Sequence, residues 1–153
     1  MAALLRFLFV IPFGFVAACA AAAFALLWPF VDLSGAGEGD PFFWVQIALG
    51  FGAQAAQVGS AALVPWGVFM LATEILGLRS LIFHVVAGLV AGFLTTRIAY
   101  GAELPHGSVQ TALVVAGLAF ALVYWIIAGR GAGRWRKARR PRPEASLERA
   151  TPL

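Results

Sequence analysis

The sequence predicts an all-α polytopic membrane protein with four transmembrane helices. Of its 153 residues, 61% are hydrophobic and only 12% are charged, whereas a soluble domain is nearer half apolar and a quarter charged. Its mean hydropathy is +0.88. The apolar residues gather into long runs separated by short polar segments. At roughly 20 residues per span, this length holds about four spans and no further domain of useful size.

The first expected span covers residues 7–31 and follows a single charge, Arg6. One basic residue before an apolar run also describes a signal peptide, and residues 16–19 (VAAC) resemble a lipobox that ends in Cys19. The apolar run continues to residue 31, which favours an uncleaved helix. Cleavage with lipidation of Cys19 stays the alternative. Within this helix, Ala17, Ala21 and Ala25 predict a smooth face for close helix packing.

The second expected span covers residues 42–76 and has no charge before Glu74. As one helix this run would measure about 52 Å, whereas the hydrocarbon core of a membrane is about 30 Å thick. Two short spans would also fit, but a protein of five spans would place its termini on opposite sides. We therefore expect one long helix, tilted and kinked near Pro65.

Polar side chains interrupt this span at Gln46, Gln54, Gln57 and Ser60. Gln54, Gln57 and Ser60 fall at helical spacing on one stripe. Amides that face lipid are costly, so we expect the stripe to face other helices or a wet crevice. Hydrogen bonds between helices are the favoured interpretation, and a polar permeation path is the alternative.

A tight turn is expected between the second and third spans. Gly77 stands where the end of a helix favours a residue in the left-handed conformation. Ser80 can cap the next helix through its side chain. Arg79 places this turn on the cytoplasmic side, because basic residues accumulate in cytoplasmic loops.

The acid, the base and the imidazole nearest this turn are Glu74, Arg79 and His84. Ionisable residues inside a membrane are candidates for function because they are costly to keep there. Glu74 and Arg79 flank the turn, so we expect them to reach the headgroup layer, pair with each other and clamp the hairpin. His84 lies one helical turn further in, and we expect a neutral imidazole bonded to a helix backbone or to Gln57. A proton or ion relay is the alternative.

The third and fourth spans are expected at residues 81–100 and 109–128. Gly88 and Gly92 form a GxxxG pattern, which is typical of close packing between membrane helices. The partner helix can come from the same chain or from another copy. Because Arg6, Arg79 and the tail lie on one side of four spans and the acidic loops on the other, we expect both termini in the cytoplasm; only Arg97 departs from this pattern.

Residues 129–153 are expected to form a basic cytoplasmic tail, largely disordered because it is rich in charge, glycine and proline. Eight of the eleven basic residues lie in it, so the sequence pI near 10.2 does not indicate a nucleic-acid groove. Seven of these residues are expected to contact anionic lipids: Arg130, Arg134, Arg136, Lys137, Arg139, Arg140 and Arg142.

No pattern in the sequence predicts catalysis, a metal site or a cofactor. The acids of the outer loops lack the spacing of metal ligands. The single cysteine allows neither an internal disulfide nor a cysteine-based metal site. Glycines 129, 131 and 133 follow a membrane helix rather than a strand, so they do not predict a phosphate-binding loop.

Two segments, 74–83 with Glu74, Arg79 and Ser80, and 124–130 with Tyr124 and Trp125, resemble small uncharacterised four-span inner-membrane proteins of alphaproteobacteria. The resemblance carries no activity and implies only placement in a bacterial inner membrane. We therefore expect a structural or accessory membrane protein that packs with itself or with a larger membrane complex. The alternative is a small oligomeric channel or transporter that uses the Gln54/Gln57 stripe with Glu74 and His84.

Overall fold

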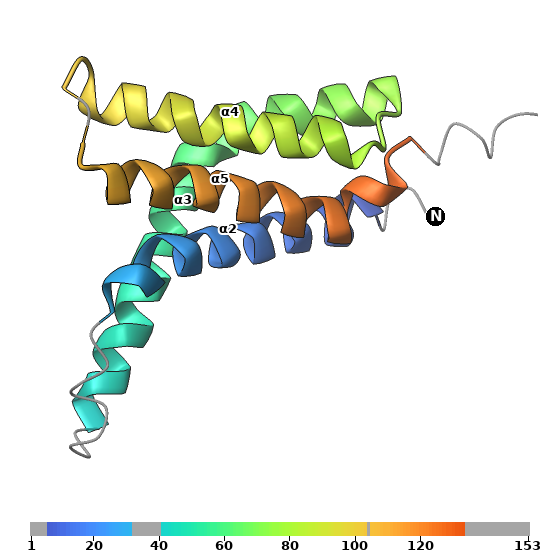
Figure 1. Ribbon diagram of the computed structural model, residues 1–153. Coiled ribbons are helices and arrows are strands. Elements are labelled where there is room, and N and C mark those ends of the chain that lie inside the picture. The colour runs from blue at the N-terminus through green and yellow to red at the C-terminus, as the bar shows by residue number, and fades with distance from the viewer. Residues whose placement is uncertain (1–5, 32–40, 104, 134–153) are drawn as a thin grey trace, which may run out of the picture.

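The computed structural model describes residues 6–31, 41–103 and 105–133, and within these ranges it contains helices and no strand. The all-α prediction is therefore confirmed. In chain order the elements are a π-helical turn η1 (Arg6–Val10), α2 (Ile11–Leu27), a 3-10 turn η2 (Trp28–Phe30), α3 (Pro41–Leu76), α4 (Leu81–Tyr100), α5 (Gly107–Ile127) and a 3-10 turn η4 (Gly129–Gly131) (Figure 1).

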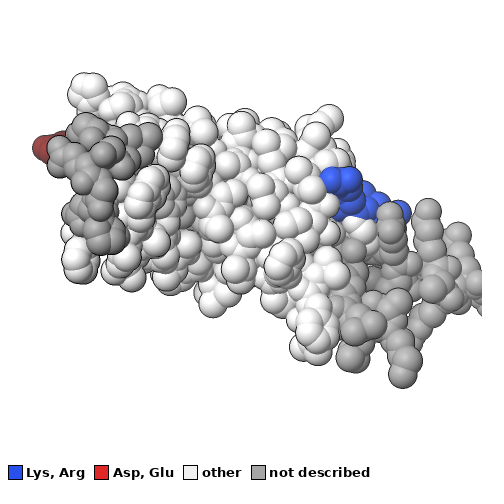
Figure 2. Space-filling view, turned by 90° about the horizontal axis from the view of Figure 1, so that it is seen from below, with Lys and Arg blue, Asp and Glu red and all other residues white. Residues whose placement is uncertain are grey.

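Four helical segments are long and apolar enough to cross a membrane, which confirms the four-span prediction. Their bounds, Phe7–Phe30, Phe42–Leu76, Leu81–Tyr100 and Gly107–Ile127, lie within two residues of the expected ones. Figure 2 shows basic side chains at one end of the molecule and an acidic side chain at the other. We call the end that holds the α3–α4 turn and η4 the turn end.

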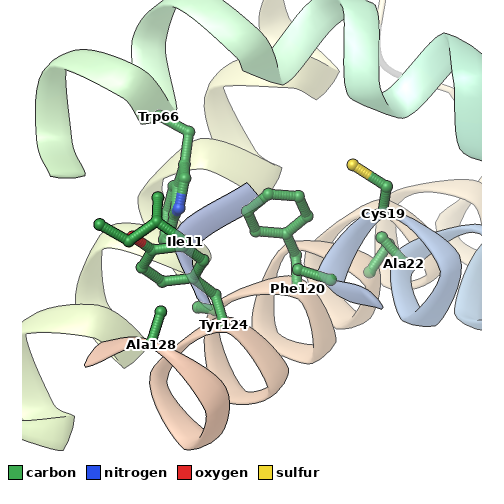
Figure 3. Close-up of a cluster of buried hydrophobic side chains, with 10 residues drawn as sticks. Ile11, Cys19, Ala22, Trp66, Phe120, Tyr124 and Ala128 are labelled. Atoms are coloured by element: carbon green, nitrogen blue, oxygen red, sulfur yellow. The ribbon is translucent and has the colours of Figure 1, made fainter. Parts of the chain in front are cut away.

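The α5 helix lies between α2 and α4 and packs along both of them (Figure 1). The α3 helix packs against α2. Trp66 links α3 to α5, because its ring lies 4.8 Å from that of Phe120 and 5.3 Å from that of Tyr124 between ring centroids. The buried cluster drawn in Figure 3 combines α2, α3 and α5: Ile11, Ala18, Cys19, Ala22, Trp66, Ala116, Phe120, Ala121, Tyr124 and Ala128.

The packed face of α2 differs from the expected one. Ala18 and Ala22 are buried and the half-buried Ala25 packs against the same core, whereas Ala17 and Ala21 are only half-buried. Gly14 continues the buried face one turn earlier, and a Cβ there would lie 3.2 Å from the Cβ of Ala128. The expected stripe is therefore correct at Ala25 but not at Ala17 and Ala21, because this alanine-rich helix offers several overlapping small-residue stripes.

The GxxxG pattern of α4 packs inside the chain, against α5. A Cβ on Gly88 would lie 2.5 Å from the backbone oxygen of Gly117, and a Cβ on Gly92 would lie 2.7 Å from that of Leu113. Gly117 on α5 is equally close to α4, since a Cβ added to Gly117 would lie 3.0 Å from the backbone nitrogen of Gly92. Glycine is required on both helices because only its absent side chain lets the two backbones approach this closely.

The α3 helix continues without interruption through Pro65 for 36 residues, or about 54 Å. One long helix rather than two short spans therefore connects the loop after α2 to the turn end. Figure 1 shows its first half leaving the bundle to one side and its second half running behind α4. A kink placed at Pro65 itself stays a prediction.

Replacing Gly117 by Val should lower the free energy of unfolding by about 1–3 kcal/mol, because the added side chain must push α4 away from α5. Unfolding in mild detergent, followed by circular dichroism, measures the change. Gly67→Ala is the control, since a Cβ at Gly67 meets nothing within 4 Å. Equal stability of the two variants would contradict the close approach of α4 and α5.

Candidate functional site

The turn between α3 and α4 closes with the backbone geometry expected for Gly77. Its φ is +70°, and the Leu78 N–H donates to the carbonyl of Thr73 over 2.9 Å. This 6→1 bond is the one that ends many helices at a left-handed glycine. Ser80 directly precedes α4, but its side chain makes no hydrogen bond to the first turn of that helix. The expected capping role of its hydroxyl is therefore wrong. Its carbonyl is used instead, as described below for His84.

Glu74 and Arg79 both bond to the backbone that follows η4. The Gly133 N–H donates to Glu74 Oε2 over 2.8 Å, and Arg79 Nε donates to the carbonyl of Ala132 over 2.5 Å. Glu74 is 4% exposed. A direct Glu74–Arg79 pair was expected, whereas these bonds place the clamp between the α3–α4 turn and the segment after α5.

Close backbone contact accompanies these bonds. Gly133 has a φ of +67°, and a Cβ on it would lie 2.8 Å from the Cα of Gly77. Gly133 therefore needs glycine for both conformation and space, and Gly77, with its φ of +70°, needs it for conformation. The sequence pattern of glycines 129, 131 and 133 contained this signal, because glycine is the residue that permits a close backbone approach.

Trp125 completes the clamp from α5. Its indole Nε1–H donates to the carbonyl of Arg79 over 2.9 Å. The guanidinium of Arg130, which is exposed, lies 5.1 Å from the centroid of the Trp125 ring, within the range of a cation–π interaction. In the sequence Trp125 was noted only as part of the segment 124–130, and its hydrogen bond across to the turn was not predicted.

His84 is the largest fully buried side chain among the described residues. Its Nδ1 lies 3.0 Å from the carbonyl of Ser80, and Nδ1 donates because a carbonyl only accepts. The expected bond to a helix backbone is therefore confirmed, and Gln57 is not its partner. The rings of Phe69 and Tyr124 flank the imidazole, with centroids 5.3 and 6.3 Å away.

The other edge of the imidazole faces Gly129. A Cβ at Gly129 would lie 3.0 Å from His84 Nε2 and 2.9 Å from Trp125 Cδ1. His84 Nε2 and Trp66 Nε1 are buried and have no hydrogen-bond partner among the described residues. Both groups lie next to Tyr124, whose ring centroid is 5.3 Å from that of Trp66.

The polar residues on the first half of α3 lie apart from this cluster. Gln46, Gln57 and Ser60 are exposed and Gln54 is half-exposed. The Ser60 hydroxyl donates to the Gln57 carbonyl of its own helix over 2.8 Å. Within the described residues the side-chain amides make no hydrogen bond to another helix, so the expected interhelical bonds do not form inside one chain.

The remaining residues that the sequence singled out are the glycines of α4 and the basic residues of the tail. Gly88 and Gly92 lie in the α4–α5 contact. Of the basic residues expected to bind lipid, Arg130 lies at the turn end, and six lie outside the described residues: Arg134, Arg136, Lys137, Arg139, Arg140 and Arg142. Among the described residues no group of three or more His, Cys, Asp or Glu side chains lies close enough to hold a metal ion.

Comparison with protein-family models, curated proteins and solved structures found no match to this chain. The interpretation of the site therefore depends on its geometry. Its hydrogen bonds connect side chains to backbone groups of distant elements, and they hold the α3–α4 turn, α5 and residues 132–133 together. This is the arrangement of a structural clamp.

Replacing Glu74 by Ala should lower the free energy of unfolding by about 1–3 kcal/mol, because the buried Gly133 N–H loses its acceptor. Unfolding in detergent measures the loss. Glu103→Ala removes an exposed carboxylate at the far end of α4 and should leave stability unchanged. If the two variants unfold alike, Glu74 does not clamp the turn.

Trp125→Phe keeps the aromatic ring and removes the N–H that bonds to Arg79, so we expect a loss of about 1 kcal/mol. The melting temperature of the purified protein measures it. Trp44→Phe is the matched control because Trp44 is 58% exposed at the start of α3. An unchanged melting temperature for Trp125→Phe would mean that the bond to the turn adds no stability.

Proposed function

We propose that this chain is a structural or accessory component of a bacterial inner membrane, which packs through α3 with other membrane helices. Both termini would lie in the cytoplasm. Arg79 and Arg130 at the turn end and Glu103 beyond the far end of α4 support this orientation, because basic residues favour the cytoplasmic side.

One observation carries the proposal: the first half of α3 contacts α2 along one face only and has no buried residue. No residue from 42 to 65 is buried, although this stretch belongs to a segment apolar enough to cross a membrane. Side-chain amides on a helix in hydrocarbon are normally bonded to a neighbouring helix. The amides of Gln46, Gln54 and Gln57 therefore favour a protein neighbour over lipid.

The channel or transporter hypothesis has less support. It needs Gln54 and Gln57 to share one path with Glu74 and His84. The amides lie on the open half of α3, whereas Glu74 and His84 are buried at the turn end and bonded to backbone groups. These bonds give both side chains a role in the fold that requires no transported species.

Anionic lipids are proposed as a second partner, at the turn end. Arg130 is exposed there and lies against Trp125, and the basic residues expected to follow it would lie near the same leaflet. Each basic residue near an anionic surface adds about 1 kcal/mol of attraction. No enzymatic activity, metal or cofactor forms part of this proposal.

A photoreactive benzophenone side chain placed at Gln57 tests whether α3 faces protein. After irradiation of native membranes, we expect a protein adduct larger than the single chain. The same side chain at Ile98, which is 84% exposed on α4, should give lipid adducts only. Lipid adducts alone at both positions would overturn the proposed function.

A further inference from the structure

The two faces of α3 differ sharply in what they contact. Gly59 lies against Cys19 of α2, since a Cβ there would be 3.4 Å from the Cys19 sulfur, and Phe51 stacks on Phe24 of α2 with centroids 5.7 Å apart. At about 100° per residue, Ala55 falls on this same face. The core-facing side of α3 is therefore fixed by its contacts with α2.

The opposite face carries the unbonded amides. Gln46 and Gln57 are separated by about three helical turns, so they lie on one line along the helix, about half a turn away from Ala55. Gly50 and Ala53 fall on the same line. A Cβ at Gly50 would meet nothing within 4 Å, and Ala53 is exposed, so a second helix can approach this face closely.

The chemistry of the amide selects the partner. A glutamine side chain has both an acceptor oxygen and two donor hydrogens, so it can bond to a copy of itself. A different protein would have to supply its own polar residue at the same depth. Two copies of this chain inserted with the same topology place identical residues at identical depth, around a two-fold axis along the membrane normal.

We infer that the face of α3 formed by Gln46, Gly50, Ala53 and Gln57 binds the same face of a second copy of this chain. The inference rests on the proposed function and names its partner. The first half of α3 leaves the bundle to one side (Figure 1), and this face lies opposite the one that contacts α2. Paired amides then give each glutamine a hydrogen-bond partner that the single chain does not provide.

Cysteine cross-linking in native membranes tests the inference. The background is Cys19→Ala, so that a single introduced cysteine reacts in each copy. Gln57→Cys should link two differently tagged copies through a short bifunctional thiol reagent. Ala55→Cys, on the face that meets α2, is the matched control and should stay unlinked.

A second measurement tests the amide itself. Energy transfer between labelled copies in lipid vesicles gives the association constant, and Gln57→Leu should lower it roughly threefold to thirtyfold, the usual range for one hydrogen bond between membrane helices. Val90→Leu on α4, where Val90 is exposed, should leave it unchanged. Equal association of the Gln57→Leu variant and the natural chain would overturn the inference.

The outcomes also separate the inference from the proposed function. A link from Gln57→Cys to a protein other than this chain overturns self-association and leaves the accessory role standing. Linking at Ala55→Cys instead of Gln57→Cys overturns the assigned face. Lipid adducts alone at position 57 in the photochemical experiment overturn both.

Discussion

The turn between α3 and α4 depends on one constraint, that backbone polar groups removed from water need partners inside the protein. At the turn end this constraint joins elements far apart in sequence. Glu74 accepts from the backbone of Gly133, and Arg79 donates to the carbonyl of Ala132. Because these bonds join the α3–α4 turn to the segment after α5, they hold the end of α3 and the start of α4 against that segment. Trp125 adds a third bond from α5 to the same turn.

Glycine provides the second condition, because the clamp and the bundle both need backbones in contact. Gly88 and Gly92 let α4 lie against Gly117 of α5. At the turn end, Gly133 lies against Gly77 in the same way. In lipid there is no hydrophobic drive between helices, so such close contacts supply much of the packing energy. A side chain at Gly88, Gly92, Gly117 or Gly133 would separate the elements that the hydrogen bonds hold.

The two halves of α3 meet these conditions differently, and this difference is the basis of the functional proposals. Its second half contributes Trp66, Thr73 and Glu74 to the buried part of the protein. Its first half contributes no buried residue from 42 to 65, yet it contains three glutamines. The amides of Gln46 and Gln57 on one face of α3 therefore have no hydrogen-bond partner among the described residues. In a membrane these amides favour a neighbouring protein helix, because lipid chains offer no hydrogen bond.

The sequence by itself determined the helix number, the span bounds, the Gly77 turn and two side chains of the clamp, Glu74 and Arg79, because hydrophobic run length and helix-end chemistry are local properties. Only the tertiary structure decided how those residues pair. Glu74 and Arg79 bond to residues 132–133, the packed face of α2 runs through Ala18 instead of Ala17, and the GxxxG pattern meets Gly117 within one chain. The reason is that these choices depend on the rotation and approach of helices distant in sequence, which local composition does not encode.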